Sequence, residues 1–112
     1  MNFAKFELFK STADSQFYFH LKAANGEIIL HGEGYTSKQS CETGIASVKR
    51  NATDGGRYER HNNMSSYTFI LKAANGETIG RSQSYGNGFN RDQGIATVMT
   101  TAPYAAIYYL NA

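Results

Sequence analysis

A seven-residue segment occurs twice in this chain, and this duplication constrains the fold more than any other feature of the sequence. Leu21–Glu27 reads LKAANGE, and Leu71–Glu77 repeats it unchanged after 50 residues. The same offset aligns further residues on both sides of the segment, so the duplication covers most of the chain. A copy of about 50 residues buries little core on its own. We therefore expect the two copies to share one hydrophobic core.

Strand patterns precede a hairpin turn in each copy. Apolar residues alternate with other residues over 17–24 and over 67–74, which is the period of a half-buried strand. Antiparallel return strands are expected at about 27–34 and 77–84. If Ile29 faces the core, as we expect also of Ile79 in the second copy, then Ile28 and Leu30, which flank Ile29, face outward.

The turns between these strands carry an Asn-Gly pair in both copies. Asn25 and Gly26 form the first pair, and Asn75 and Gly76 form the second. Asn-Gly is the strongest short signal for a hairpin with a type I′ turn, in which both central residues have positive φ. We predict such a turn in each copy.

A helix follows the third strand of each copy. Ser37 is a suitable N-cap, and apolar residues after it fall on one helical face: Cys41, Ile45 and Val48. Gly44 and Gly94 lie in the middle of the two helices, where glycine costs about 1 kcal/mol relative to alanine. Because both helices have a glycine at the same position in spite of this cost, we expect the helix backbone to lie close against the sheet there.

The C-terminal segment Ala105–Leu110 is apolar, and no charged side chain follows Asp92. Because an exposed segment of this kind promotes aggregation, we expect a paired strand here. The predicted fold is α+β, with one continuous antiparallel sheet and both helices on one face. The chain is predicted to be a single domain, 1–112, made of one repeat at about 3–53 and another at about 56–110.

Several segments resemble the YegP-like family, whose members are small bacterial and archaeal proteins with one or two copies of a domain of unknown function. The segments that carry the resemblance are FELF at 6–9, FHLKAANGE at 19–27, YTSK at 35–38 and GIASVK at 44–49. The resemblance implies tandem β(3)-α-β units that form one sheet and exchange their C-terminal strands between repeats. It implies no activity, cofactor or catalytic residue.

Residues that could carry catalysis are scarce. The three histidines are not at metal-ligand spacing, and the single cysteine, Cys41, falls on the predicted core face of a helix. Gly-rich segments at 32–34 and 86–88 do not continue into a phosphate-binding motif. We therefore expect no enzyme, no metal site and no cofactor.

The sheet face turned away from the helices is the more promising surface. In the first copy the outward positions are Tyr18, His20 and Lys22, and in the second copy they include Lys72. Aromatic and basic groups on an open sheet suit either a contact with a protein partner, including another copy of this chain, or weak binding of single-stranded nucleic acid. The formal net charge of +2 is small for nucleic-acid binding.

Six residues outside the core are the same in both copies without a structural reason as clear as a turn. They are Lys22 and Lys72, Glu27 and Glu77, and Tyr35 and Tyr85. Each hairpin end, with a lysine and a tyrosine beside it, is therefore predicted to form one of two equivalent weak binding patches.

The remaining expectations concern location and assembly. Charged residues interrupt the first ten positions, which is unlike a signal peptide, and one cysteine fits a reducing compartment. We expect a cytoplasmic, non-enzymatic interaction module that has no membrane contact and is a monomer or a weak dimer.

Overall fold

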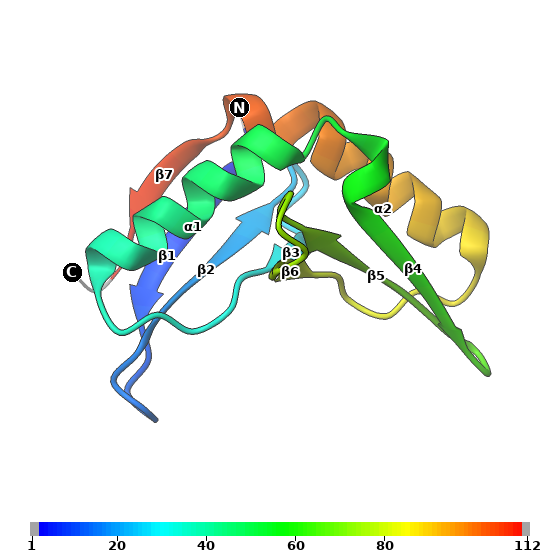
Figure 1. Ribbon diagram of the computed structural model, residues 1–112. Helices are drawn as coiled ribbons and strands as arrows, with labels where there is room; N and C mark the ends of the chain where they lie inside the picture. The colour runs from blue at the N-terminus through cyan, green and yellow to red at the C-terminus, as the bar shows by residue number, and fades with distance from the viewer. Residues whose placement is uncertain (1–2, 111–112) are drawn as a thin grey trace.

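The computed structural model describes residues 3–110, where seven strands form one sheet with two α-helices on one face (Figure 1). The first half contains β1 (Lys5–Lys10), β2 (Phe17–Lys22), β3 (Ile28–His31) and α1 (Lys38–Asn51). The second half contains β4 (Tyr58–Asn63), β5 (Ser66–Lys72), β6 (Thr78–Arg81), α2 (Gly88–Thr101) and β7 (Ala106–Tyr109). Short 3₁₀ turns precede β4 and β7: η1 (Gly55–Arg57) and η2 (Ala102–Tyr104). The predicted α+β order is confirmed.

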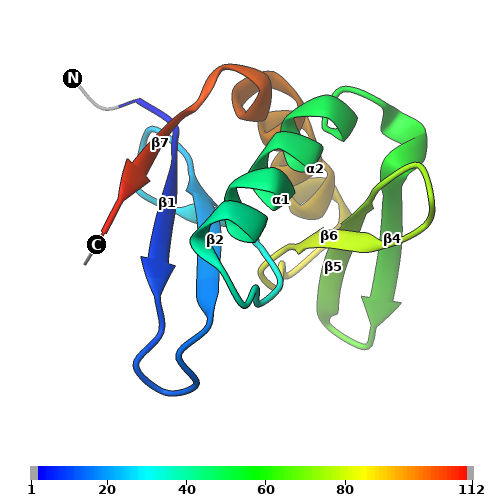
Figure 2. The same cartoon turned by 60° about the vertical axis from the view of Figure 1, so that its left-hand side comes forward.

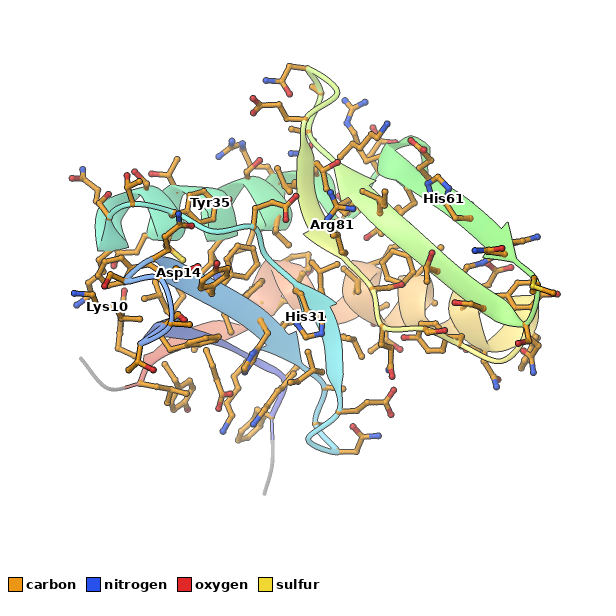
Figure 3. The ribbon with its side chains drawn as sticks, turned by 90° about the horizontal axis from the view of Figure 1, so that it is seen from below. Lys10, Asp14, His31, Tyr35, His61 and Arg81 are labelled. Carbon is orange, nitrogen blue, oxygen red and sulfur yellow. The ribbon has the colours of Figure 1, made fainter. Side chains whose placement is uncertain are left out.

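The sheet joins the two repeats edge to edge. Its strand order is β4-β5-β6-β3-β2-β1-β7, and β3 meets β6 antiparallel at His31 and Arg81. The two halves slope away from this join like the sides of a roof, with the helices above (Figure 1). The helix-free face is therefore the underside, which Figure 3 shows from below, with His31 and Arg81 near its middle.

The C-terminal strand connects the two repeats. β4 follows α1 and pairs with β5 within the second half, whereas β7 follows α2 and crosses to pair with β1 of the first half. β7 thus makes the expected contact of a C-terminal strand with the other repeat. The sheet is mixed rather than entirely antiparallel, because β7 runs parallel to β1. A strand reached through a helix can run parallel to its neighbour, since the helix carries the chain back along the sheet.

One hydrophobic core lies between the sheet and both helices. Both helices reach across the join, since α1 contacts β2 and β6 while α2 contacts β5 and β3. Phe6 and Phe19 from the first half and Phe69 from the second are almost fully buried and belong to one cluster. The two copies thus fill the same core.

The helix starts follow from their caps. The Ser37 Oγ accepts a hydrogen bond from the Ser40 N–H at 3.0 Å, as predicted. In the second repeat the Asn87 side chain accepts from the Asn90 N–H at 2.7 Å, and α2 begins at the next residue after this cap.

Tyrosine rings account for the mid-helix glycines. A Cβ on Gly44 would lie 2.2 Å from the Tyr35 Oη, and a Cβ on Gly94 would lie 2.3 Å from the Tyr85 Oη. The close approach expected at these positions therefore involves a tyrosine from the segment before each helix rather than the sheet.

The hairpin turns differ from the prediction. Gly26 and Gly76 have φ of 88° and 89°, but neither Asn25 nor Asn75 has positive φ. The type I′ prediction is therefore wrong. The bond from the Gly26 N–H to the Ala23 carbonyl, at 2.9 Å, closes a type I turn that is followed by a glycine bulge.

The outward position predicted for Leu30 is also wrong. The pairing of β2 with β3 shifts register, so that Leu21 lies opposite Leu30 and Lys22 lies opposite Ile28. Ile29 is the extra residue of this bulge, and both Ile29 and Leu30 are buried. A bulge breaks the strict alternation on which the prediction depended.

Candidate functional site

A buried carboxylate organises the helix-free face of the first repeat. Glu7 Oε1 lies 2.6 Å from His20 Nε2 and 3.1 Å from Lys22 Nζ, and Glu7 Oε2 lies 3.8 Å from Lys5 Nζ. Burial alone would raise the pKa of Glu7, but the hydrogen bonds from His20 and Lys22 hold that pKa below its usual range. The predicted outward residues His20 and Lys22 therefore both contact the Glu7 carboxylate and form an ion cluster with it.

The aromatic residues of this face pack on one another. Phe9 stacks on Tyr18 with ring centroids 6.1 Å apart and contacts the His20 ring at 5.2 Å. The Tyr18 hydroxyl donates to Asp14, and this bond raises the pKa of Tyr18. His31 lies beside His20, and its pKa is lowered by burial and by the charge of His20. The aromatic rings of this face therefore pack against one another.

The second repeat has a simpler version of this cluster. Lys72 and His61 both bond Glu59, whose side chain is 41% exposed, against 9% for Glu7. Ile70 stands where the first repeat has His20, so this carboxylate lacks the buried imidazole partner.

Two open clefts lie where the hairpin of one repeat meets the helix of the other. The first has a volume of about 330 Å³ and is lined by Asn25, Glu27, Tyr85 and Gly94, among others. The second has a volume of about 520 Å³ and is lined by their equivalents: Asn75, Glu77, Tyr35 and Gly44. Residues that are identical in both copies thus converge at equivalent places.

The arrangement of these patches differs from the predicted one. Tyr35 does not lie beside its own hairpin, because the β3–β6 join brings it to the hairpin of the second repeat. Lys22 lines a different hollow, of about 230 Å³, with Lys5, Phe3 and Tyr108. In the first repeat the predicted lysine and tyrosine, Lys22 and Tyr35, therefore line separate hollows.

The single cysteine lies in the hydrophobic core. Burial raises the pKa of the Cys41 thiol to about 11, so this cysteine is a poor nucleophile. Within residues 3–110 no group of three or more His, Cys, Asp and Glu side chains is placed to hold a metal ion. None of the helices in this range is long and apolar enough to span a membrane.

The outer edge of β7 is the feature that the sequence prediction did not single out. Figure 2 shows β7 at the margin of the sheet beside β1. Four large apolar side chains at this margin are 42–68% exposed: Phe3, Tyr108, Tyr109 and Leu110. The strand is paired, as expected, but on one side only. The sequence alone shows that this segment carries no charged residue. Its position at the edge of the sheet follows only from the strand order of the structure.

The geometry defines a tandem-repeat α+β protein whose two units complete one sheet. Comparison with known sequences places the chain in a family: residues 13–59 and 63–108 each match the Domain of unknown function (DUF1508). The chain therefore belongs to this family, which confirms the YegP-like resemblance.

Relatives and solved structures agree with this assignment. The chain is 60% identical over 55 residues to UPF0339 protein YegP of Escherichia coli K12, an alignment that covers 49% of each chain, so it spans about half the length of this relative. A solution structure of UPF0339 protein SO3888 from Shewanella oneidensis has a TM-score of 0.89 at 42% identity, over 96% of this chain and 91% of that one. The solution structure of yegP from E. coli gives 0.88 at 44% identity, over 97% and 94%.

Proposed function

We propose that this protein is a non-enzymatic interaction module of the cytoplasm that binds an extended polypeptide strand along the outer edge of β7. The observation that carries the proposal is the gathering of exposed apolar side chains around an uncharged edge strand. Tyr108 and Tyr109 flank this edge on opposite faces of the sheet, beside Lys5 and beside α1, and exposed apolar side chains gathered at one place often mark an interaction site. An added strand gains main-chain hydrogen bonds from the edge and specificity from the side chains beside it.

The opposite edge of the same sheet supports this choice. β4 carries Glu59, Arg60 and His61, followed by two asparagines. Charged side chains on an edge strand discourage pairing with another chain. β7 has no such protection, although it occupies the same kind of position.

The nucleic-acid alternative has less support from the geometry. Lys22 and Lys5 lie against Glu7, and the Phe9 and Tyr18 rings stack on each other. Fewer free cations and ring faces therefore remain for phosphates and bases. This alternative predicts binding that weakens steeply with salt, which the test below also measures.

The test uses a fluorescent hexapeptide of alternating threonine and valine as an extended probe. We expect saturable anisotropy changes that depend little on salt, with NMR shifts at 106–110. Tyr108→Lys places a charge on this edge and should weaken binding about tenfold. Asn63→Lys places the same charge at the end of β4, where the side chain is exposed, and should leave binding unchanged. Absence of saturable binding, or equal weakening by both variants, would overturn the proposal.

A further inference from the structure

We infer that the strand bound at this edge is β7 of a second copy of the chain, in a two-fold antiparallel pair. The inference rests on the proposed function and specifies its partner. The dimer joins two seven-stranded sheets into one, with the helices of both copies on the same face.

The backbone of β7 is suitably oriented for this contact. The Leu110 N–H donates to the Leu8 carbonyl at 2.8 Å, so Leu110 directs its N–H inward to β1. Since successive residues of a strand alternate in the direction of their N–H and C=O groups, Ile107 and Tyr109 direct theirs outward. With Tyr108 on the two-fold axis, Ile107 of one copy exchanges hydrogen bonds with Tyr109 of the other.

The charges near this edge are compatible with the pairing of two identical β7 strands. No residue of β7 is charged, so two copies of the strand meet without repulsion. Above the strand, α1 presents one cation and one anion beside Tyr109: Lys38 lies 4.5 Å from the centre of its ring, and Glu42 accepts from its hydroxyl. On this face a two-fold axis brings one Lys38 and one Glu42 from each copy to the joint, so their charges balance. On the helix-free face Lys5 lies 5.1 Å from the centre of the Tyr108 ring, and Glu7, 3.8 Å from its ammonium, offsets its charge.

The alternative contact, β7 of one copy on β4 of the next, is disfavoured. That arrangement is head-to-tail and would continue as an open chain of molecules. It would also place the uncharged strand against Arg60 and His61 of the β4 edge. The two-fold pair closes after two copies and leaves both charged β4 edges in solvent.

Sedimentation velocity of the full chain over a concentration series up to the millimolar range tests the inference. We expect the wild type to shift from the monomer mass to twice that mass, and Tyr108→Lys and Tyr108→Glu each to remain monomeric. Identical charges face each other across the axis in these homodimers, whereas mixing the two variants places opposite charges there and should restore the dimer. Asn63→Lys is the matched control and should dimerise like the wild type.

Each outcome is decisive. A wild type that stays monomeric throughout, while the threonine–valine peptide still binds, overturns the inference and leaves the proposed function standing. If the wild type stays monomeric and the peptide does not bind, both the inference and the proposed function are overturned. A dimer that persists in Tyr108→Lys, or a mixture that stays monomeric, also overturns the β7 pairing. Thermal unfolding of each variant checks that the monomer remains folded.

Discussion

The N-terminal and C-terminal repeats share their turns and helix contacts but differ where they face each other. Asn25 and Asn75 make the same turn bond at 2.9 Å, and both mid-helix glycines lie under a tyrosine. At the join, however, Leu30 of β3 meets Gly80 of β6, where a Cβ would lie 2.7 Å from the leucine side chain. The Leu30 side chain occupies the space next to Gly80, and a second leucine at position 80 would collide with it. The two repeats are therefore complementary at the join rather than identical there.

Removing the larger partner should have the greatest effect. Leu30→Ala deletes a fully buried side chain and leaves a cavity at the join, so the free energy of unfolding should fall by about 2–5 kcal/mol. Urea unfolding followed by circular dichroism measures the loss. Ile28→Ala, at the half-buried neighbouring position, should cost less.

The double variant Leu30→Ala/Gly80→Ala tests whether the two residues share one space. Gly80→Ala alone crowds Leu30 and should cost about 1–3 kcal/mol. After Leu30 is shortened, the same methyl group partly fills the cavity. The double variant should therefore be more stable than the sum of the single effects predicts. Strict additivity would show that the two sites are independent.

A smaller effect, equal in the two repeats, is expected at the mid-helix glycines. Alanine normally stabilises a helix by about 1 kcal/mol relative to glycine. At Gly44 and Gly94 the added Cβ collides with a tyrosine hydroxyl, so each Gly→Ala variant should lose about 1–3 kcal/mol instead.

Gly55→Ala serves as the control for these variants. No atom lies within 4 Å of a Cβ at Gly55, so the change should stay within about 0.5 kcal/mol. Stabilisation by alanine at either helical site would contradict the tyrosine contact, and unequal losses would show that the two contacts differ in rigidity. Differential scanning calorimetry of the three variants makes the comparison.

Local features of the fold were predictable from the sequence, because they depend on neighbouring residues. Ser37 caps its helix, Cys41 is buried, and the strand patterns fall where the alternation placed them. The turn type was not predictable from Asn25-Gly26 alone, since Asn-Gly also suits a type I turn with a bulge.

Contacts between the repeats could not be predicted in the same way. Local patterns do not specify which strands become neighbours, so the pairing of Tyr35 with the second hairpin and the open edge of β7 were missed. The burial of Leu30 depends on a bulge, which shifts the alternation by one residue and carries no clear sequence signal.

The two carboxylates on the helix-free face offer the finest comparison. The folded-state pKa of Glu7 is lowered by His20 and Lys22 against the effect of burial, and that of Glu59 is lowered chiefly by the hydrogen bond from Lys72. A carboxyl whose folded pKa lies below its unfolded value stabilises the fold above that unfolded value, here 4.5. This stabilisation is lost as the pH falls from about 4.5 toward the lowered folded pKa.

Glu7→Gln should therefore flatten the loss of stability between pH 6 and pH 3 more than Glu59→Gln does. The Glu59 side chain is 41% exposed, so water and salt screen its ion pair, and its variant should change stability less than Glu7→Gln does. Urea unfolding across this pH range, at low and high salt, separates the two. Because the Glu7 cluster is shielded from solvent, its effect should persist at high salt while that of Glu59 fades. If both variants respond equally to pH and salt, the imidazole and the burial that distinguish the first repeat do not strengthen its ion cluster.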